Sequence, residues 1–471
     1  MRPYLYLSDL VPLHRAWALA VAGLASLACA QGLPPEVTRA LERAQLPPTA
    51  LHVVVAPAQG GPERLSLQAD RPVNPASLMK LVTTSAALDL LGPAYVWRTT
   101  LWSDGPLVQG VLRGNLYVQG QGDPKLVVER LWLLLRRLKA LGIDRIEGDL
   151  VLDRSAFDVT HVDPGQFDGE PTRPYNASPD ALIVNYKSLL LHWVPDRAQG
   201  VARLHVEPPM AGLRAPSSVP LQKIPCTDYR GNLQADFSKP DQLQFKGAYP
   251  QDCGERVWPV AYAEPGAHAG RAIQGMWATL GGLGLSRVRD GRVPAQAQKL
   301  LESESPTLGE VVRDINKFSN NLMADQLFLT LSFQVGGVGR FEDSRAWVQR
   351  WWAQRVGVSG LNLDNGSGLS RSHRVTAQGL AVLLQHAYAS PYMAELMASL
   401  PILGQDGTLR RAQSETRAHL KTGSLRNVLG IAGYVDGAAG QRWVLVAIIE
   451  HPQAQSGRPV LQALADWAGK P

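Results

Sequence analysis

Ser77 and Lys80 stand three residues apart in the segment NPASLMKLVTTSAALDLLG, a spacing at which a serine and a lysine can perform nucleophilic catalysis. The segment has the pattern of a buried helix, on which residues three apart share one face. Burial near a second cation favours the neutral form of a lysine, which a general base requires. Free N–H groups in the first turn would favour negative charge developing near Ser77. Because Ser-x-x-Lys also arises by chance, the pair predicts an acyl-transfer enzyme only together with further signals.

A second candidate motif, Ser319-Asn320-Asn321, lies where the helical pattern breaks between GEVVRDINKF and LMADQLFLTL. On an irregular turn, Ser319 and Asn321 could both point into a cleft, one relaying a proton and the other holding a substrate amide. The competing interpretation is a solvated junction between two helices.

A third candidate motif, Lys421-Thr422-Gly423, lies in a strand pattern with Ser424 next. At the border of a cleft, Lys421 could anchor a substrate carboxylate and Thr422 could offer it a hydroxyl. Gly423 would let the substrate backbone approach closely. The competing interpretation is an ordinary edge strand with a glycine.

The three motifs occur in the order that penicillin-recognising serine enzymes share, each on the local structure that its role requires. The chain resembles in particular the low-molecular-mass, class C penicillin-binding proteins, which are D-alanyl-D-alanine carboxypeptidases and endopeptidases. The likeness covers nearly all of the chain after residue 30. Its other segments are LYVQGQGDPKL, IEGDLVLDRSAF, PYNASPDALIVNYKS, DNGSGLSR and LPILGQDGTLRRA.

The resemblance implies a catalytic role for three of these residues. Ser77 would be the acylated nucleophile, Lys80 its base, and Ser319 the proton relay toward the leaving amine. Water would release the acyl-enzyme, whereas penicillin would form a slowly hydrolysed ester. The resemblance also implies that the reaction needs neither a metal nor an organic cofactor.

Other residues would bind the substrate if the resemblance holds. Asn321 would hold the peptide amide, and Lys421 with Thr422 would hold the terminal carboxylate. The backbone N–H groups of Ser77 and Ser424 would form the oxyanion hole.

Two features leave alternatives open. Asn365 stands where the family often has Asp, and Arg371 in the same segment would either contact the peptide stem or serve as a structural loop cation. The family also uses an acidic residue in the insertion to meet a free amine of the substrate, for which Glu170 and Asp168 are the candidates.

Two rival functions accompany the prediction of a D-Ala-D-Ala carboxypeptidase and DD-endopeptidase that penicillins inhibit covalently. One is a β-lactamase of the same fold, against which the long insertion argues. The other is a catalytically silent wall-binding scaffold, against which the intact motifs argue. The expected partners are peptidoglycan peptides and β-lactam antibiotics.

The fold expected from the pattern and the resemblance is a transpeptidase-like α/β domain of the α+β type, built from residues 31–92 and 302–471. It would contain an antiparallel sheet flanked by helices. Two β-rich domains would be inserted, one from 93–186 and 258–301 and the other from 187–257. Within the catalytic domain, the first motif predicts a helix with Asn74 as N-cap, Pro75 as its first residue and Gly92 as its end.

Size and composition agree with an exported, multidomain protein. At 471 residues the chain is too long for one ordinary core. Residues 1–30 read as a signal peptide ending at Ala28-Cys29-Ala30, with lipidation of Cys29 as the weaker alternative. The remaining cysteines, Cys226 and Cys253, are then expected to form a disulfide in an oxidising compartment.

Charge and hydropathy narrow the partners further. The net charge of +6 is mild for this length and basic residues are scattered, so nucleic acid is not expected as a partner. A polyanionic wall or membrane surface remains an alternative to a merely soluble basic surface. After residue 30 no stretch approaches the roughly 18 to 20 apolar residues of a membrane span.

Overall fold

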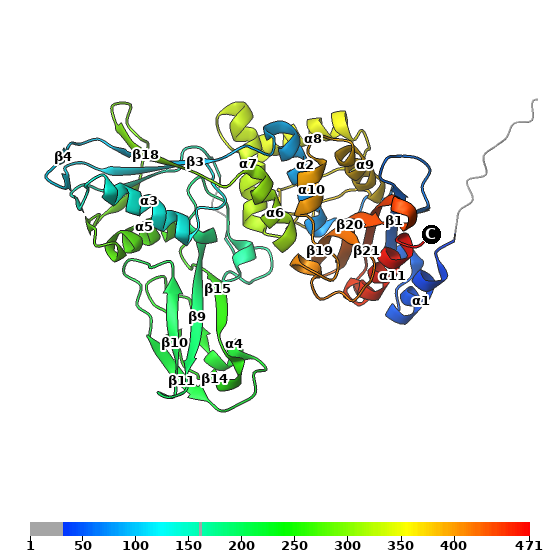
Figure 1. Ribbon diagram of the computed structural model, residues 1–471, viewed down its shortest axis with the longest axis horizontal. Coiled ribbons are helices and arrows are strands. Elements are labelled where there is room, and N and C mark those ends of the chain that lie inside the picture. Colours follow the sequence, from blue (N-terminus) through cyan, green and yellow to red (C-terminus); the bar gives the residue numbers. More distant parts are fainter. Residues whose placement is uncertain (1–31, 160–162) are drawn as a thin grey trace, which may run out of the picture. The chain divides into compact units, whose positions relative to one another are not determined.

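The computed structural model describes residues 32–159 and 163–471 (Figure 1). The predicted signal peptide and Cys29 lie outside the described residues. Residues Leu33–Pro471 form one compact unit, so the domain boundaries at residues 93, 187, 258 and 302 stay a prediction.

A five-stranded antiparallel sheet unites the two ends of the chain, as the sequence predicted (Figure 1). Its order is β19-β20-β21-β1-β2. The strands are β1 (Leu51–Pro57), β2 (Leu65–Leu67), β19 (Ala418–Leu425), β20 (Val428–Asp436) and β21 (Arg442–Glu450). Since β19 is the first strand in this order, its outer edge has no neighbouring strand in the sheet.

Alternate residues of β21 enter different hydrophobic cores, because successive side chains of a strand point to opposite faces. One core takes Val444, Val446 and Ile448, and the other takes Leu445, Ala447 and Ile449. Two helices, α1 (Pro35–Ala44) and α11 (Arg458–Ala468), pack on the second core. The sheet is therefore covered on both faces.

Six helices accompany the first core. They are α2 (Met79–Leu91), α6 (Leu308–Phe318), α7 (Asn321–Gly336), α8 (Phe341–Arg355), α9 (Ala377–Tyr388) and α10 (Met393–Ser399). Every residue of α2 from Met79 to Leu88 is buried, which confirms the expected central helix.

The start of α2 differs from the prediction. Residues Ala76–Leu78 form a 3-10 turn, η2, and the α-helix begins only at Met79. Ala76 has a φ of 48°, in the left-handed region, which a continuous α-helix from Pro75 would not allow. The expected end at Gly92 is confirmed, with a φ of 74°.

Residues 93–304 contain the remaining sheets. One sheet has the order β17-β8-β6-β3-β18 and a second has the order β16-β7-β5-β4. Their strands are β3 (Arg98–Ser103), β4 (Leu107–Val108), β5 (Val111–Leu112), β6 (Leu116–Gly120), β7 (Arg145–Ile146), β8 (Leu150–Asp153), β16 (Leu283–Gly284), β17 (Val288–Asp290) and β18 (Gln298–Glu304).

Two helices in this region were not expected from the sequence, α3 (Val128–Ala140) and α5 (His268–Thr279). In α3 the buried residues Leu131, Leu134, Leu135 and Leu138 recur at helical spacing and join the core beneath the sheets. Residues 93–304 are β-rich, as expected, and also contain these two helices.

A third sheet of the insertion carries the disulfide. Its order is β14-β11-β10-β9-β15, and a two-stranded sheet and a short helix accompany it. The elements are β9 (Ser188–Asp196), β10 (Val201–Glu207), β11 (Ser218–Gln222), α4 (Tyr229–Leu233), β12 (Ala235–Asp236), β13 (Gln244–Phe245), β14 (Tyr249–Pro250) and β15 (Arg256–Ala261).

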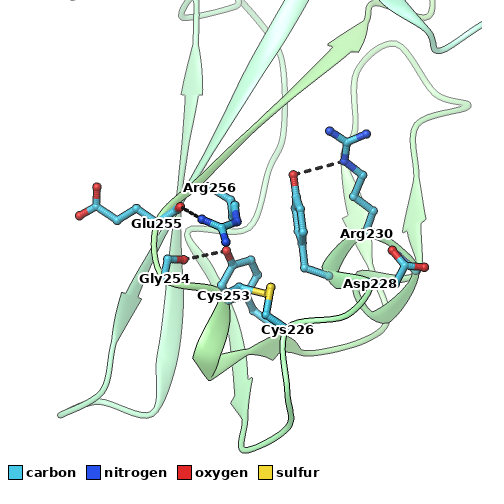
Figure 2. Close-up of a disulfide and its surroundings, with 10 residues drawn as sticks. Cys226, Asp228, Arg230, Cys253, Gly254, Glu255 and Arg256 are labelled. Carbon is cyan, nitrogen blue, oxygen red and sulfur yellow. Dashed lines mark hydrogen bonds between the residues drawn. A yellow bond between two sulfur atoms is a disulfide. The ribbon is translucent and has the colours of Figure 1, made fainter. Parts of the chain in front are cut away.

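Cys226 and Cys253 form the expected disulfide (Figure 2). The neighbouring Gly254 carbonyl accepts a hydrogen bond of 2.8 Å from Tyr249 Oη. Of the helices that the structure describes, none combines the length and apolar character needed to cross a bilayer.

Candidate active site

The hydroxyl of Ser77 and the amine of Lys80 are in contact. Asn74 Oδ1 accepts a 2.8 Å hydrogen bond from Ala76 N, which holds the turn that presents Ser77. Lys80, one turn later and with no exposed surface, places Nζ 3.0 Å from Ser77 Oγ. The pair predicted from the spacing therefore exists in the fold.

Lys80 Nζ has two further acceptors, Asn321 Oδ1 at 2.7 Å and the Ser367 carbonyl at 2.5 Å. A neutral amine can donate two hydrogens to these oxygens, which leaves its lone pair for the Ser77 hydroxyl. Burial lowers the pKa of Lys80, and the nearby Asp325 charge opposes that shift. The surroundings thus favour the form that can accept a proton.

The second motif lies on the turn between α6 and α7, as predicted. Ser319 has a φ of 57° and ends α6, which begins at a capping box formed by Thr307 and Glu310. The middle residue, Asn320, caps α7 by accepting a 3.0 Å hydrogen bond from Met323 N. The left-handed turn separates the two helices and directs Ser319 and Asn321 to different lysines.

Lys421 on β19 reaches Ser319. Its Nζ, which has no exposed surface, donates to Ser319 Oγ at 2.9 Å and to the Thr422 carbonyl at 2.7 Å. Burial and the charge of Lys80 lower the pKa of Lys421. Lys421 was expected to anchor a substrate carboxylate as a cation, and its buried surroundings favour the neutral amine.

Gly423 lies against the segment that carries Ser77. A Cβ on Gly423 would lie 2.7 Å from the Pro75 carbonyl oxygen and 3.0 Å from Leu78 Cγ. The glycine therefore lets β19 pack on the nucleophile turn, a reason for its presence that the sequence did not indicate. Its expected closeness to a substrate backbone stays a prediction.

Thr422 and Ser424 lie at the open side of β19. Thr422 Oγ1 is 2.8 Å from Thr408 Oγ1, a residue that the sequence analysis did not single out. Ser424 is exposed, and its Oγ accepts from Gln455 Nε2 at 3.2 Å. The hydroxyls of Thr422 and Ser424 thus each have a side-chain partner, in Thr408 and Gln455.

The model of the D-Ala-D-Ala carboxypeptidase 3 (S13) family matches residues 34–470 of this sequence. The chain belongs to this family. This match and the relatives described next confirm the predicted family resemblance, fold class and enzyme class.

Two curated relatives of this S13 family chain are D-alanyl-D-alanine carboxypeptidases. The protein from Actinomadura sp. (strain R39) is 28% identical over 434 residues, covering 87% of this chain and 79% of the relative. DacB from Haemophilus influenzae is 27% identical over 390 residues, covering 79% of this chain and 80% of the relative.

The crystal structure of penicillin binding protein 4 from H. influenzae resembles the S13 chain with a TM-score of 0.70 at 26% identity. The match covers 91% of this chain and 99% of that one. The same protein complexed with a β-lactam gives a TM-score of 0.67 at 25% identity.

Arg371 of the S13 chain bonds to the insertion. Its Nη2 donates to the Phe167 carbonyl at 2.8 Å, and its guanidinium carbon lies 4.9 Å from the centre of the Phe167 ring. These contacts fit the structural-cation alternative, and the predicted contact to a peptide stem stays a prediction.

The two acidic candidates in the insertion differ in how their carboxylates are used. Asp168 accepts from Tyr175 Oη and from Asn176 Nδ2, each at 2.8 Å. Glu170 forms one exposed ion pair of 3.2 Å with Arg173. The carboxylate of Glu170 is therefore the one with free capacity for a ligand amine.

A turn that the sequence did not assign to the site holds the Ser367 carbonyl toward Lys80. Asn365 Oδ1 accepts from Ser367 N at 3.1 Å and from Gly368 N at 3.0 Å. It also lies 3.2 Å from His373 Nε2, and burial lowers the pKa of His373 to about 4. A neutral His373 can donate to the amide oxygen, so Asn365 performs the acceptor role that a carboxylate would have.

Asp325 is a further residue near the site that the sequence analysis did not identify. Its Oδ1 accepts from Gly366 N at 2.9 Å, so α7 supports the Asn365–Gly368 turn. Burial raises the pKa of Asp325, while the Lys80 charge opposes the shift. The spacing of four residues from Asn321 on one helix was the available signal.

No group of three or more His, Cys, Asp or Glu side chains within residues 32–159 and 163–471 is arranged to hold a metal ion.

Proposed function

We propose that the protein is an exported serine D-Ala-D-Ala carboxypeptidase that cleaves D-alanine from peptidoglycan stem peptides through an acyl-enzyme on Ser77. The observation that supports it is the position of Lys80 Nζ, 3.0 Å from Ser77 Oγ and 2.7 Å from Asn321 Oδ1. Cleavage of crosslinked peptides would add DD-endopeptidase activity, because both reactions acylate the serine with the same D-alanine and differ in the leaving amine.

Acylation would begin at the Ser77 hydroxyl. Neutral Lys80 takes the Oγ proton as the oxygen attacks the carbonyl of the penultimate D-alanine. Collapse of the tetrahedral intermediate breaks the peptide bond, and the proton passes to the leaving amine with Ser319 as relay. The backbone N–H groups of Ser77 and Ser424 would stabilise the oxyanion.

Substrate binding would use the groups around Lys421. The terminal carboxylate would lie against Lys421 Nζ and the Thr422 hydroxyl, and Asn321 Nδ2 would meet the peptide carbonyl. Because burial and the Lys80 charge lower the pKa of Lys421, a bound carboxylate would stabilise its ammonium form and bind with uptake of a proton. Glu170 would receive a free amine of the stem peptide, and Arg371 would position the loop beside it.

Deacylation would complete the cycle. Water attacks the ester carbonyl and Lys80 accepts its proton. The tetrahedral intermediate then expels Ser77 Oγ, which takes that proton back from Lys80 as the shortened stem peptide leaves as a carboxylic acid. A penicillin would acylate the same oxygen. Its ester would hydrolyse far more slowly than about one per second, which is the lower end of usual enzymatic turnover rates.

Export is proposed from two features of the chain. The first thirty residues have the pattern of a signal peptide. The Cys226–Cys253 disulfide is a bond that persists in oxidising compartments. A periplasmic or wall-facing location would bring the enzyme to its substrate.

The test compares the wild type, Ser77→Ala and Ser85→Ala after incubation with fluorescent penicillin and with a D-Ala-D-Ala pentapeptide. Ser85 lies on the same helix, and its buried hydroxyl has no hydrogen-bond partner in the described structure. We expect labelling and D-alanine release from the wild type and Ser85→Ala, and neither from Ser77→Ala. Equal labelling of Ser77→Ala would reject Ser77 as the nucleophile.

The endopeptidase activity is tested separately on crosslinked wall peptides. Separation of the digest should give uncrosslinked peptides in amounts that grow with time. If D-alanine appears while the crosslinked peptides remain, the enzyme is a carboxypeptidase alone.

A further inference from the structure

One part of the insertion holds an unusual share of the exposed large hydrophobic side chains. Among the described residues, half of the residues in this class lie on α3, on the two-residue strands β4 and β16, or directly after α3. They are Leu107, Val108, Trp132, Leu133, Leu141 and Leu283. Neither the catalytic groups nor the proposed substrate contacts involve them.

The outer face of α3 has a regular pattern. Trp132, Arg136 and Ala140 form one row at intervals of four, and Leu133 and Arg137 form the row beside it. Trp132 is 41% exposed and Leu133 is 47% exposed, although the opposite face of α3 is fully packed. From Trp132 onward, the helix therefore carries apolar side chains and, one turn later, cations on the same outward surface, while the exposed Glu129 lies one turn before Leu133.

These residues line a hollow of about 590 Å³ together with Lys139 and Leu280. Every charged side chain in its lining is a cation: Arg136, Arg137 and Lys139. The Arg136 guanidinium carbon lies 5.4 Å from the centre of the Trp132 ring, which keeps a cation beside the exposed aromatic group. Lys139 is the least available of the three, since it pairs with Asp144 at 3.0 Å.

We propose that the outer face of α3, defined by Trp132, Leu133, Arg136, Arg137 and Leu280, binds the surface of an anionic phospholipid membrane. Indole and leucine side chains favour the boundary between headgroups and acyl chains, and arginines bind the phosphates above it. All charged side chains of the lining are cations, which complements the phosphates of such a membrane. A membrane-bound enzyme would act on wall close to its site of synthesis.

The test measures flotation of the full mature chain with vesicles of phosphatidylcholine, with and without added phosphatidylglycerol. We expect binding only to the anionic vesicles and weaker binding at high salt. Arg136→Gln with Arg137→Gln should weaken binding about thirtyfold. Trp132→Ser with Leu133→Ser should weaken it at least about tenfold.

Matched controls separate the α3 face from general surface changes. Val194→Ser with Val257→Ser removes side chains that are 41% and 47% exposed, the same fractions as Trp132 and Leu133. For the charge change, Arg39→Gln with Arg43→Gln removes an exposed arginine pair from α1.

Both controls should bind like the wild type, and all four variants should keep penicillin labelling. Equal binding to both kinds of vesicle, an equal loss in the controls, or a wild-type dimer that the α3 variants dissociate would overturn the proposal. Because labelling of Ser77 is read in the same samples, a failure of lipid binding is distinct from a failure of the proposed enzyme activity.

Discussion

At the scale of single residues, the site holds two buried lysines whose charged forms are disfavoured by burial. Lys80 and Lys421 have no exposed surface, and the charge on Lys80 lowers the pKa of Lys421. Asp325 is the carboxylate whose charge acts on Lys80. The site is thus expected to hold fewer protons than two exposed lysines would, which leaves an amine ready to act as a base.

Asp325→Asn tests how the carboxylate controls that amine. An asparagine Oδ1 can still accept from Gly366 N, so the turn is kept while the charge is removed. The carboxylate raises the pKa of Lys80, so its loss should lower that pKa and make the base available at lower pH. The rising acid limb of kcat/KM should move down by roughly one pH unit.

Asp89→Asn is the control for Asp325→Asn, because it makes the same charge change on α2, where Asp89 pairs with Arg355 at 2.9 Å. Its acid limb should match that of the wild type. An acid limb that stays in place in Asp325→Asn, or moves up, would show that the carboxylate does not act on Lys80.

The turn between α6 and α7 decides, at the scale of elements, which lysine each polar group of the second motif meets. The backbone of Ser319, in this turn, has a left-handed conformation, which costs a non-glycine residue roughly 1 kcal/mol. Ser319→Gly removes the hydroxyl and permits the turn, whereas Ser319→Ala removes the hydroxyl and keeps the strain. The pair of variants separates chemistry from backbone geometry.

Both variants are expected to lose about a hundredfold to ten-thousandfold in acylation rate, because the proton relay is missing in each. Thermal unfolding should find Ser319→Gly the more stable of the two by about 1 kcal/mol. Stopped-flow acylation by a chromogenic penicillin measures the rate. Retention of the wild-type rate in Ser319→Gly alone would assign the role to the turn and not to the hydroxyl.

Elements with strong local patterns were predictable from the sequence. The strand pattern that became β19 and the helical break at Ser319 were both found, since each depends on residues close in the chain. The late start of α2 was not found, because the left-handed Ala76 is held by Asn74 and by packing on Gly423. Tertiary contacts override helix signals in such places.

The same limit applies to the site. Each of the three motifs could be located by its spacing, but Asp325 and the Asn365 turn act through Gly366 and Ser367, which lie far from α2 in the chain. Only the fold brings the Ser367 carbonyl oxygen to 2.5 Å from Lys80 Nζ. Helix α3 was missed for another reason. Its leucines lie between short strand patterns, and the whole region was therefore assigned to β-rich domains.

At the scale of the whole molecule, buried polar contacts join the inserted region to the catalytic helices. Gln326 on α7 donates to the carbonyls of Gly122 at 3.1 Å and Asp180 at 2.9 Å, and accepts from Asp180 N at 2.8 Å. Asn321 Nδ2 likewise donates to the Tyr175 carbonyl at 3.1 Å. The insertion therefore helps to fix the helix that carries the second motif.

The part of the insertion that holds the disulfide, residues 218–261 (the disulfide module), lies apart from these contacts. This separation gives a prediction for the double variant Cys226→Ser/Cys253→Ser. The bond closes a loop of 27 residues in sequence separation, and the chain-entropy model gives it about 3 to 4 kcal/mol of stabilisation. Limited proteolysis should cut the variant faster between β11 and β15, with the fragments identified by mass spectrometry. Penicillin labelling should persist, because the hydrogen bonds of Ser77, Lys80, Ser319 and Lys421 described above all lie outside residues 218–261. Loss of labelling in a variant that is cut only within the module would show that this part of the insertion also supports the catalytic cleft.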